Sequence, residues 1–411
     1  MKLDDILELD QNDPLAYKRE QFVLPDELIY LDGNSLGALP ITAREMAAEI
    51  IEKQWGQELV RSWNSNHWID LPVIAGEKIA PLLGVAPGQV ICCDSISVNL
   101  FKLLAAALNL QPDRYVVLSQ QDNFPADLYM AQGLGELCGP QSCELKLIED
   151  SDIETALDET VAVLMLTHVN YRSGKIHDMK RLTRLAHDKG VLVIWDLAHS
   201  AGALPLELDD CEADFAVGCG YKYLNGGPGA PAFIYAAKCH QDSIRQPLSG
   251  WMGHRTPFSF EQNYQAAEGM RQFLCGTPPV LSMGVLDAAL SIFDDVDMHV
   301  LRRKSIRLGE LFLQLVVAND HLNELALVSP MESTERGSQL AFAHPRAFAI
   351  CQALIARGVI ADFRAPDVLR FGFAPLYLRY KDIRDSVQIL SDIITNGIYK
   401  EEKYSRLQKV T

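Results

Sequence analysis

The sequence predicts an α/β fold, with a mainly parallel central sheet flanked by helices and a smaller α+β domain. Three observations carry this prediction. Between residues 88 and 236, short apolar runs alternate with helical patterns. Each run is apolar at successive positions, which is typical of strands buried on both faces of a helix-covered parallel sheet. Polar residues follow the carboxyl ends of several runs, where open α/β sheets bind their ligands.

Six strands of this sheet are predicted from the apolar runs. They cover Val90 to Cys93, Tyr115 to Leu118, Val161 to Leu166, Val191 to Trp195, Phe215 to Val217 and Ala232 to Tyr235. The clearest unit begins at Val161 and ends at Trp195, with a helix between its two strands. Asp178 is the expected N-cap of that helix, and Gly190 follows its end. A strand, a helix and a strand in this order form a βαβ crossover, so the two strands should run parallel.

The last third of the chain follows a different pattern, which predicts the second domain. One long helix is expected over Val280 to Val317, with Arg302-Arg303-Lys304 on its solvated side. Short mixed strands come next, and two more helices are expected over Phe348 to Arg357 and Asp382 to Asn396. The expected division is an N-terminal segment (1–40) that packs with the small domain, a large α/β domain (41–285) and a small domain (286–411).

Composition excludes several classes of partner. The 411 residues carry a formal net charge of −17, whereas nucleic-acid binding needs a basic face. The nine cysteines form no Cys-x-x-Cys pair, so neither a metal site nor a disulfide framework is expected. No stretch approaches the ~20 apolar residues of a membrane span, and the N-terminus lacks the apolar core of a signal peptide. A cytoplasmic location is therefore expected.

The loop after the first predicted strand carries hydroxyl groups at the start of a helix. Its sequence is Asp94-Ser95-Ile96-Ser97-Val98-Asn99, and the helix begins near Leu100. Hydroxyls and free backbone N–H groups at a helix start bind anions such as phosphate. Ser, Asp and Asn are also ordinary N-cap residues, so this loop alone does not define a site.

The loops after the later strands add an aromatic ring, carboxylates, a hydroxyl and a histidine. Phe124 and Asp127 follow the second strand, and Thr167 follows the third. Asp196 ends the fourth strand, and His199 lies three residues further on. A buried carboxylate is costly unless a cation meets it. Taken alone, however, Asp196 could be a helix N-cap and His199 a hydrogen-bonded core histidine.

Lys222 follows the fifth strand, between two tyrosines. It could be a surface lysine that snorkels. At the same sheet edge as Asp196, desolvation would instead lower its pKa and make its amine a nucleophile. Pyridoxal phosphate needs a lysine for its aldehyde, a carboxylate for its pyridinium nitrogen, an anion cradle and a stacking ring. These needs are met by Lys222, Asp196, Ser95 with Ser97, and Phe124 or His199, so the residues predict an enzyme of this cofactor.

The motifs around these residues resemble the fold-type I pyridoxal-phosphate enzymes of the aminotransferase class V branch, and within it the kynureninase family. The Asp-x-x-His pattern and the later lysine are shared across the branch. The motifs that carry the resemblance span nearly the whole chain. They are Tyr30-Leu31-Asp32-Gly33-Asn34-Ser35-Leu36-Gly37, Arg61-Ser62-Trp63-Asn64, Asn123-Phe124-Pro125-Ala126-Asp127, Trp195-Asp196-Leu197-Ala198-His199-Ser200-Ala201-Gly202, Tyr221-Lys222-Tyr223-Leu224-Asn225-Gly226-Gly227-Pro228-Gly229, Gly250-Trp251-Met252-Gly253-His254, Cys275-Gly276-Thr277-Pro278-Pro279 and Leu369-Arg370-Phe371-Gly372-Phe373-Ala374-Pro375-Leu376-Tyr377. The Gly33-Asn34-Ser35 opening and the Gly250-Trp251 segment look specific to the kynureninase family.

The resemblance implies a cofactor site built around Lys222, which would bind the aldehyde and carry protons. Asp196 would hold the pyridinium nitrogen, and Phe124 would stack on the ring. Ser97 with the Ile96 backbone, Tyr221 and Asp127 would secure the phosphate and its surroundings. Thr167 and His199 would line the ring's edge.

The resemblance also implies a homodimer with active sites at the subunit interface. Trp251 and Thr277 would reach the phosphate of the cofactor in the partner subunit. Arg370 would clamp the substrate carboxylate, a task suited to a bidentate guanidinium, while Ser35 and Trp63 would face the aromatic amine. Two simpler readings stay open: Trp251 as ordinary core, and Arg370 paired with an acid of the small domain.

The implied reaction is hydrolysis of L-kynurenine to anthranilate and L-alanine, in tryptophan catabolism and NAD biosynthesis. Tyr221 is the expected acid for Cβ. Family members that favour 3-hydroxykynurenine tend to carry His at the position of Trp63, so unsubstituted kynurenine is expected here.

Two alternatives remain open: another class V reaction (cysteine desulfuration or transamination), and a non-enzymatic sensor. A desulfurase needs a cysteine on a mobile loop, which neither Cys239 nor Cys351 resembles. A sensor needs a DNA-binding module, for which the chain lacks the length and the basic charge.

Overall fold

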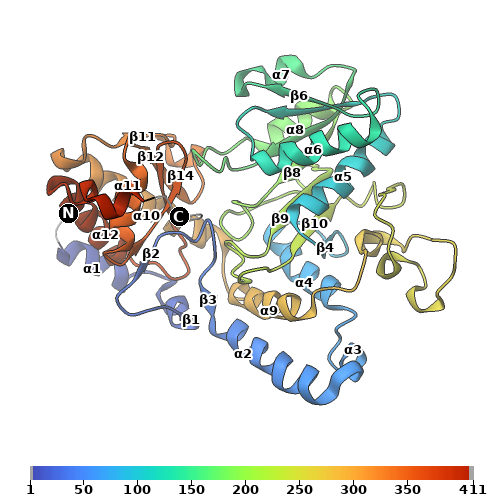
Figure 1. Ribbon diagram of the computed structural model, residues 1–411, viewed down its shortest axis with the longest axis horizontal. Helices are drawn as coiled ribbons and strands as arrows, with labels where there is room; N and C mark the ends of the chain where they lie inside the picture. The colour runs from blue at the N-terminus through green and yellow to red at the C-terminus, as the bar shows by residue number, and fades with distance from the viewer. Residues whose placement is uncertain (1–2, 407–411) are drawn as a thin grey trace.

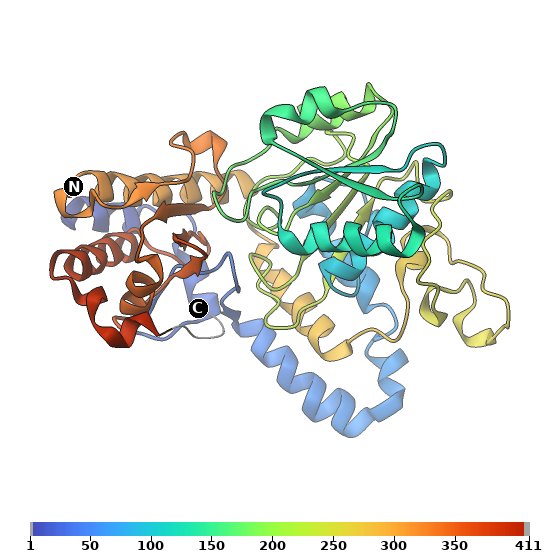
Figure 2. The same ribbon diagram turned by 45° about the horizontal axis from the view of Figure 1, so that its top comes forward.

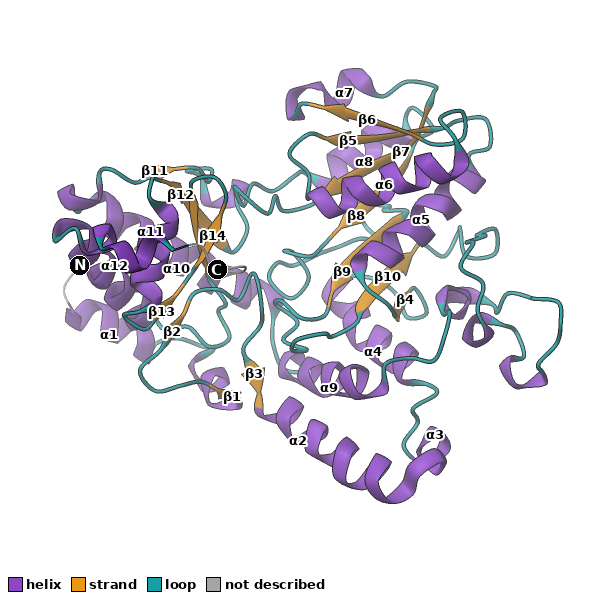
Figure 3. Cartoon of the chain, in the orientation of Figure 1, coloured by secondary structure: helices purple, strands orange, loops and turns teal. Residues whose placement is uncertain are grey.

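A computed structural model describes residues 3–406 of the chain. Figure 1 shows a large sheet-containing body beside a smaller body that combines the C-terminal third with the N-terminal segment. Figure 3 shows that each body is built around its own sheet. No helix within residues 3–406 is long and apolar enough to cross a membrane.

The large body contains a seven-stranded sheet in the order β4-β10-β9-β8-β7-β5-β6. Only β10 runs antiparallel to its neighbours, so the sheet is mixed but mainly parallel. The six predicted strands are confirmed, with ends that differ by one or two residues. The strands are β4 (Val90–Cys92), β5 (Val116–Gln120), β6 (Glu144–Ile148), β7 (Val161–Thr167), β8 (Leu192–Asp196), β9 (Phe215–Cys219) and β10 (Ala232–Ala236). The antiparallel direction of β10 was not predicted, because an apolar run does not encode direction.

Strand β6 (Glu144–Ile148) was not predicted. It lies at the edge of the sheet, and most of its side chains are exposed or half-buried. Its charged residues, Glu144 and Lys146, interrupt the continuous apolar pattern that identified the buried strands. An edge strand therefore lacks the signal by which central strands are found.

Helices cover both faces of this sheet, as expected for the fold class. Two helices, α5 (Ile96–Leu110) and α6 (Pro125–Cys138), pack on one face. The other face carries α4 (Leu71–Ile79), α8 (Met179–His187) and α9 (Val280–Leu290). Asp178 caps α8 as predicted, since its side chain accepts a hydrogen bond from the Arg181 N–H. The result is a three-layer body with two hydrophobic cores.

The smaller body has a four-stranded antiparallel sheet in the order β11-β12-β15-β14. Its strands are β11 (Ala326–Leu327), β12 (Gln339–Ala343), β14 (Asp362–Arg364) and β15 (Val368–Gly372), and its helices are α10 (Met298–Val317), α11 (Ala347–Ile355) and α12 (Tyr380–Thr395). The N-terminal segment joins it: α1 (Leu3–Gln11) packs on α12, and β2 (Ile29–Tyr30) pairs with β13 (Val359–Ile360).

The long helix expected over Val280 to Val317 is wrong. The chain forms α9 and α10 with a break between Leu290 and Met298, because Asp297 caps the second helix by accepting bonds from the His299 and Val300 N–H groups. The solvated side expected for the basic triplet is confirmed only for Arg303, which is exposed. Lys304 is buried and ion-paired with buried Asp13, and Arg302 donates to three backbone carbonyls of the 333–337 loop.

Two segments project from the large body. One is a helical hairpin formed by α2 (Ile41–Glu49), the π-helix that continues it (Ile50–Glu58) and α3 (Ser62–Ser65). The other, residues 245–279, is called the arm below; it is drawn in yellow in Figures 1 and 2. The arm contains three short 3-10 turns and no strand of either sheet. Both segments carry exposed aromatic side chains, among them Trp55, Trp251, Phe258 and Phe260.

Candidate active site

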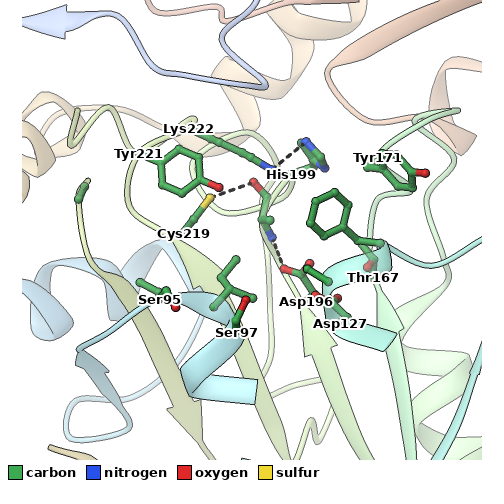
Figure 4. A pocket seen from close by; sticks show the side chains of 16 residues that line it. Ser95, Ser97, Asp127, Thr167, Tyr171, Asp196, His199, Cys219, Tyr221 and Lys222 are labelled. Atoms are coloured by element: carbon green, nitrogen blue, oxygen red, sulfur yellow. Dashed lines mark hydrogen bonds between the residues drawn. The ribbon is translucent and has the colours of Figure 1, made fainter. Parts of the chain in front are cut away.

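A cavity of about 650 Å³, including its open mouth, lies at the carboxyl ends of the parallel strands. Such a position is where open α/β sheets bind ligands, and the size is that of small-molecule sites. Figure 4 shows side chains from several strand ends converging on it. The lining residues are Ser95, Ile96, Ser97, Phe124, Ala126, Asp127, Thr167, Tyr171, Asp196, Ala198, His199, Cys219, Tyr221, Lys222, Ala230 and Ala232. The fold thus brings together nine of the predicted site residues: Ile96, Ser97, Phe124, Asp127, Thr167, Asp196, His199, Tyr221 and Lys222.

Lys222 projects into this cavity from the loop that follows β9. Its Nζ lies 3.2 Å from Nε2 of His199 and 5.9 Å from the ring centroid of Tyr221. Burial, followed by the positive charges of Lys222 and Arg370, holds the pKa of His199 well below its usual value. His199 is therefore a neutral ring at physiological pH. Its Nε2 also lies 3.1 Å from the Asn34 carbonyl, while its Nδ1 has no partner within residues 3–406.

Asp196 lies at the base of the cavity, at the end of β8, and is 2% exposed. One carboxylate oxygen accepts the Ala198 N–H at 2.8 Å. Burial raises the pKa of Asp196, while the charge of Lys222 opposes that rise. Asp196 therefore makes a bond of the kind that an N-cap residue makes, and it also faces the cavity (Figure 4).

Asp127 is a second buried carboxylate beside Asp196. It lies in the first turn of α6, and within residues 3–406 neither of its oxygens has a hydrogen-bond partner. The nearby Thr167 hydroxyl donates instead to Asn123. Burial and then the charge of Asp196 raise the pKa of Asp127 well above its usual value. Two adjacent buried carboxylates that share a single donor, the Ala198 N–H, need a cation between them, or must hold a proton.

Asp127→Asn is expected to flatten the pH dependence of apoprotein stability. Both buried carboxyls have raised folded-state pKa values. Above the unfolded value of about 3.9, the folded state therefore binds more protons, and stability falls as pH rises towards the raised pKa. The slope of one such group is at most about 1.4 kcal/mol per pH unit. Urea unfolding of apoprotein at several pH values measures it, and parallel curves for variant and wild type would contradict the argument.

The opposite end of the cavity is lined by Ser95, Ile96 and Ser97, which belong to the loop of residues 94–97, called the anion loop below. Ser95 is the N-cap of α5 and accepts a hydrogen bond from the Val98 N–H at 3.4 Å. The N–H groups of Ile96 and Ser97 belong to the first turn of this 15-residue helix, where intrahelical acceptors are lacking. The helix dipole adds a partial positive charge there. The loop therefore suits a phosphate.

An aromatic wall borders the cavity. Phe124 precedes α6 and is 40% exposed, and its ring centroid lies 5.2 Å from that of Tyr171 in an edge-to-face contact. Burial raises the pKa of Tyr221, so its hydroxyl keeps its proton at neutral pH. Tyr171 lines the cavity but was given no role from the sequence, although its loop was recognised as the end of a strand.

Arg370 pairs with Asp362, an acid of the small domain, which is the alternative that the sequence left open. It is 1% exposed, and its Nε donates to Asp362 Oδ1 at 2.7 Å while Nη2 contacts the second Asp362 oxygen. Nη2 also lies 3.3 Å from the Ser35 hydroxyl, which itself donates to Asp362 at 2.6 Å. Nη1 bonds the Tyr171 carbonyl at the wall of the cavity. These contacts use four of the five guanidinium N–H groups, so a substrate carboxylate can bind two of them at once only if one present partner gives up its bond.

Three further predicted positions do not line the cavity of their own chain. Trp63 lies on α3 at the end of the helical hairpin and packs edge-to-face on Trp68, with ring centroids 5.9 Å apart. Trp251, 38% exposed, and the exposed Thr277 lie on the arm. Trp251 is therefore not the core residue of the simpler reading. No contact within one chain tests the role of these three positions.

Pyridoxal phosphate fits the residues of this cavity. The unpartnered carboxylate of Asp127 and the buried carboxylate of Asp196 beside it suit a cationic ring nitrogen, and the anion loop lies within the same cavity for a phosphate. Lys222 supplies the amine.

Solved structures agree on the fold: the cysteine desulfurase from Thermococcus onnurineus has a TM-score of 0.75 at 17% identity, covering 96% of this chain and 99% of that one. A cysteine desulfurase from Escherichia coli has a TM-score of 0.76 at 18% identity, covering 93% and 98%. The chain therefore has the fold-type I architecture of these enzymes.

Sequence comparison narrows this class to one family. Curated kynureninases from Burkholderia pseudomallei (strain 1106a) and Pseudomonas fluorescens are 49% and 46% identical, and each alignment covers 99% of both chains. The family model of the kynureninase C-terminal domain matches residues 301–390. The model of the DegT/DnrJ/EryC1/StrS aminotransferase family matches residues 76–207. The chain belongs to the kynureninase family.

Proposed function

We propose that this chain hydrolyses L-kynurenine to anthranilate and L-alanine. The observation that carries the proposal is the full-length identity to kynureninases, combined with a cavity that joins Lys222 to two buried carboxylates and an anion loop. When bound, pyridoxal phosphate supplies an electron sink that makes the Cα–H and Cβ–Cγ bonds of the substrate labile. One water is consumed: its OH ends in the anthranilate carboxyl group and its hydrogen on the Cβ of alanine.

The chain's own residues divide the work of this reaction. Lys222 binds the cofactor's aldehyde in the resting enzyme and moves the proton of the substrate Cα. Asp196, with Asp127 beside it, holds the ring nitrogen protonated. Tyr221, whose raised pKa keeps its proton available, is the donor to Cβ. Arg370 binds the substrate carboxylate, which replaces one of the present bonds of its guanidinium. Ser35 lies beside the same guanidinium.

Two measurements on the purified protein test this function. The protein should be yellow from bound cofactor, and kynurenine should release the blue fluorescence of anthranilate. A yellow protein that releases no anthranilate would overturn the proposal. Cysteine desulfuration is the alternative to assay on the same sample, because Cys219 lines the cavity. Burial raises the pKa of Cys219, and its Sγ contacts the Ala198 carbonyl at 3.8 Å. It is therefore a thiol rather than a nucleophilic thiolate.

We also propose that two copies of the chain form a homodimer. Large apolar side chains are exposed along the helical hairpin, among them Ile51, Trp55, Leu59 and Val60, and on the arm, including Phe258 and Phe260. Exposed apolar surface of this extent is typical of an interface. A partner subunit would also give a function to Trp63, Trp251 and Thr277, which do not line their own cavity. Light scattering coupled to size-exclusion chromatography should return a mass near twice 45.7 kDa.

Trp63→His is expected to shift substrate preference towards 3-hydroxykynurenine. We propose that Trp63 faces the substrate's aromatic ring in the partner subunit's cavity, where an imidazole can hydrogen-bond a ring hydroxyl. One such bond changes relative kcat/KM by roughly tenfold. Steady-state kinetics with both substrates measure the ratio, so each variant is its own control. An unchanged ratio would place Trp63 away from the substrate.

A further inference from the structure

Lys102 is a buried cation that the proposed reaction does not use. It lies in the second turn of α5, is 0% exposed and does not line the cavity. Its Nζ donates to the Asp94 carboxylate and to the Phe273 carbonyl, each at 2.5 Å. Burying an ammonium is costly unless its hydrogen bonds are made. The position of Lys102 thus depends on two partners from segments far apart in the sequence.

The first partner, Asp94, turns the chain from β4 into the anion loop. Its φ of +46° lies in the left-handed region, which is strained for a residue other than glycine. Two bonds hold this conformation: the Ala232 N–H donates to the Asp94 carbonyl at 2.9 Å, and Lys102 grips the side chain. The next residue, Ser95, is the N-cap of α5. The direction of the anion loop therefore depends on the Lys102–Asp94 pair.

The second partner, the Phe273 carbonyl, belongs to the arm. The strand-like stretch that follows it packs against the turn that carries Trp251. The Met252 N–H donates to the Cys275 carbonyl at 3.1 Å, and a β-carbon at Gly250 would lie 2.3 Å from the same oxygen. The two stretches of the arm are therefore in backbone-to-backbone contact. By holding Phe273, Lys102 fixes both the stretch that leads to Thr277 and the turn at Trp251.

We propose that Lys102 is a positioning residue. By bonding both Asp94 and Phe273, it fixes the position of the arm relative to the anion loop of its own chain. This inference rests on the proposed function and dimer, in which the arm reaches the partner subunit's cofactor. A single ammonium then orders phosphate contacts in two active sites: its own through Asp94, and the partner's through Phe273. The two segments that contact one cofactor phosphate are thereby positioned by the Lys102 residues of different chains.

Lys102→Met tests the inference, because methionine fills a similar volume without a charge or a donor. In the apoprotein, hydrogen exchange should accelerate roughly tenfold at the amides of both Val98 and Met252, since local opening is no longer restrained. The dissociation constant of pyridoxal phosphate should rise roughly tenfold, the equivalent of one lost charge-assisted hydrogen bond. Lys18→Met is the matched control. Lys18 lies in the N-terminal segment, is nearly as buried, at 1%, and pairs with Asp295, so its loss should leave both readouts unchanged.

Hybrid dimers separate the two roles of Lys102. In the first hybrid, a Lys102→Met chain pairs with a Lys222→Ala chain, so the one working site has the altered anion loop and a normal arm. In the second, a chain with both substitutions pairs with wild type, so the one working site has a normal loop and the altered arm. Cofactor affinity of the working site, read from its absorption band, should fall in both hybrids by about threefold or more.

Asp94→Asn is the second variant, in case the methionine variant does not fold. It removes the ion pair but leaves Lys102 bonded to Phe273. Exchange should therefore accelerate at Val98 and not at Met252. Unchanged exchange and affinity in Lys102→Met, or an effect in only one hybrid, would overturn the inference. If wild type binds no pyridoxal phosphate, the proposed function fails, whereas the exchange measurements on apoprotein still decide whether Lys102 holds both segments.

Discussion

Lys222→Ala is expected to abolish kynurenine hydrolysis, lowering kcat by at least about 10⁴-fold. Alanine removes the only lysine amine that lines the cavity within residues 3–406. It therefore removes both the covalent hold on the cofactor and the group that moves the Cα proton. The variant should fold normally, because the Nζ of Lys222 makes one hydrogen bond, to His199, and anchors no other element. Its colour should change because the absorption band of bound aldehyde is lost.

The measurement is single-turnover anthranilate release, with circular dichroism as the check on folding. Lys238→Ala, a substitution in the loop after β10 and outside the cavity, is the matched control and should retain wild-type turnover. Small primary amines added to Lys222→Ala should restore part of the proton transfer, since the cavity opens to solvent. Turnover within tenfold of wild type would overturn both the cofactor assignment and the proposed function.

The sequence was sufficient to predict the site wherever its residues follow buried strands. Asp196 and Lys222 end or follow strands β8 and β9, which are register neighbours in the sheet. Parallel neighbours deliver their carboxyl ends to one edge, so listing the residues after each strand was enough to bring these side chains together. Asp127 was found in the same way, from the loop after β5. Its position beside Asp196, which places two buried carboxylates side by side, is visible only in the structure.

The sequence was not sufficient where two bodies meet. The bond between Arg370 and Asp362 joins neighbouring strands β15 and β14 of the small sheet, but the contact with the Tyr171 carbonyl crosses to the large body. No periodicity in the chain encodes that approach. Lys102 presents the same difficulty. On α5 it follows a run of apolar residues, and only the packing of the arm against that helix reveals why a charge is buried there.

Edge elements were the other failure, for a physical reason. Strand β6 and the break between α9 and α10 both lie at the surface, where several side chains face solvent and interrupt the apolar pattern. Asp294, Asp295 and Asp297 signal a helix start when the break is known, yet the apolar pattern on either side continues in phase. Core periodicity outweighs a single capping residue in a sequence-based prediction.

Asp196→Asn is expected to lower kcat by roughly 10³-fold while leaving the fold intact. Asparagine keeps the shape of the side chain and can accept the Ala198 N–H bond, so the N-cap-like contact survives. What it loses is the negative charge that keeps the ring nitrogen of the cofactor protonated. The electron sink weakens because a neutral ring accepts charge from the substrate less readily. Burial raises the pKa of Asp196, so the folded apoprotein carries a cost for its ionised form.

That cost makes the two readings of Asp196 distinguishable by experiment. If Asp196 were only a helix cap, asparagine would preserve both stability and activity, because it caps as well as aspartate does. If it serves the cofactor, activity falls while apoprotein stability at pH 8 stays equal or rises, since an ionisable group with a raised pKa is removed. Urea unfolding of the apoprotein and kcat of the reconstituted enzyme give the two values. Asp209→Asn, at a surface-accessible carboxylate that bonds Gln89 outside the cavity, is the control for the substitution itself. Loss of activity together with loss of stability would assign Asp196 to the fold; loss of activity alone assigns it to the cofactor.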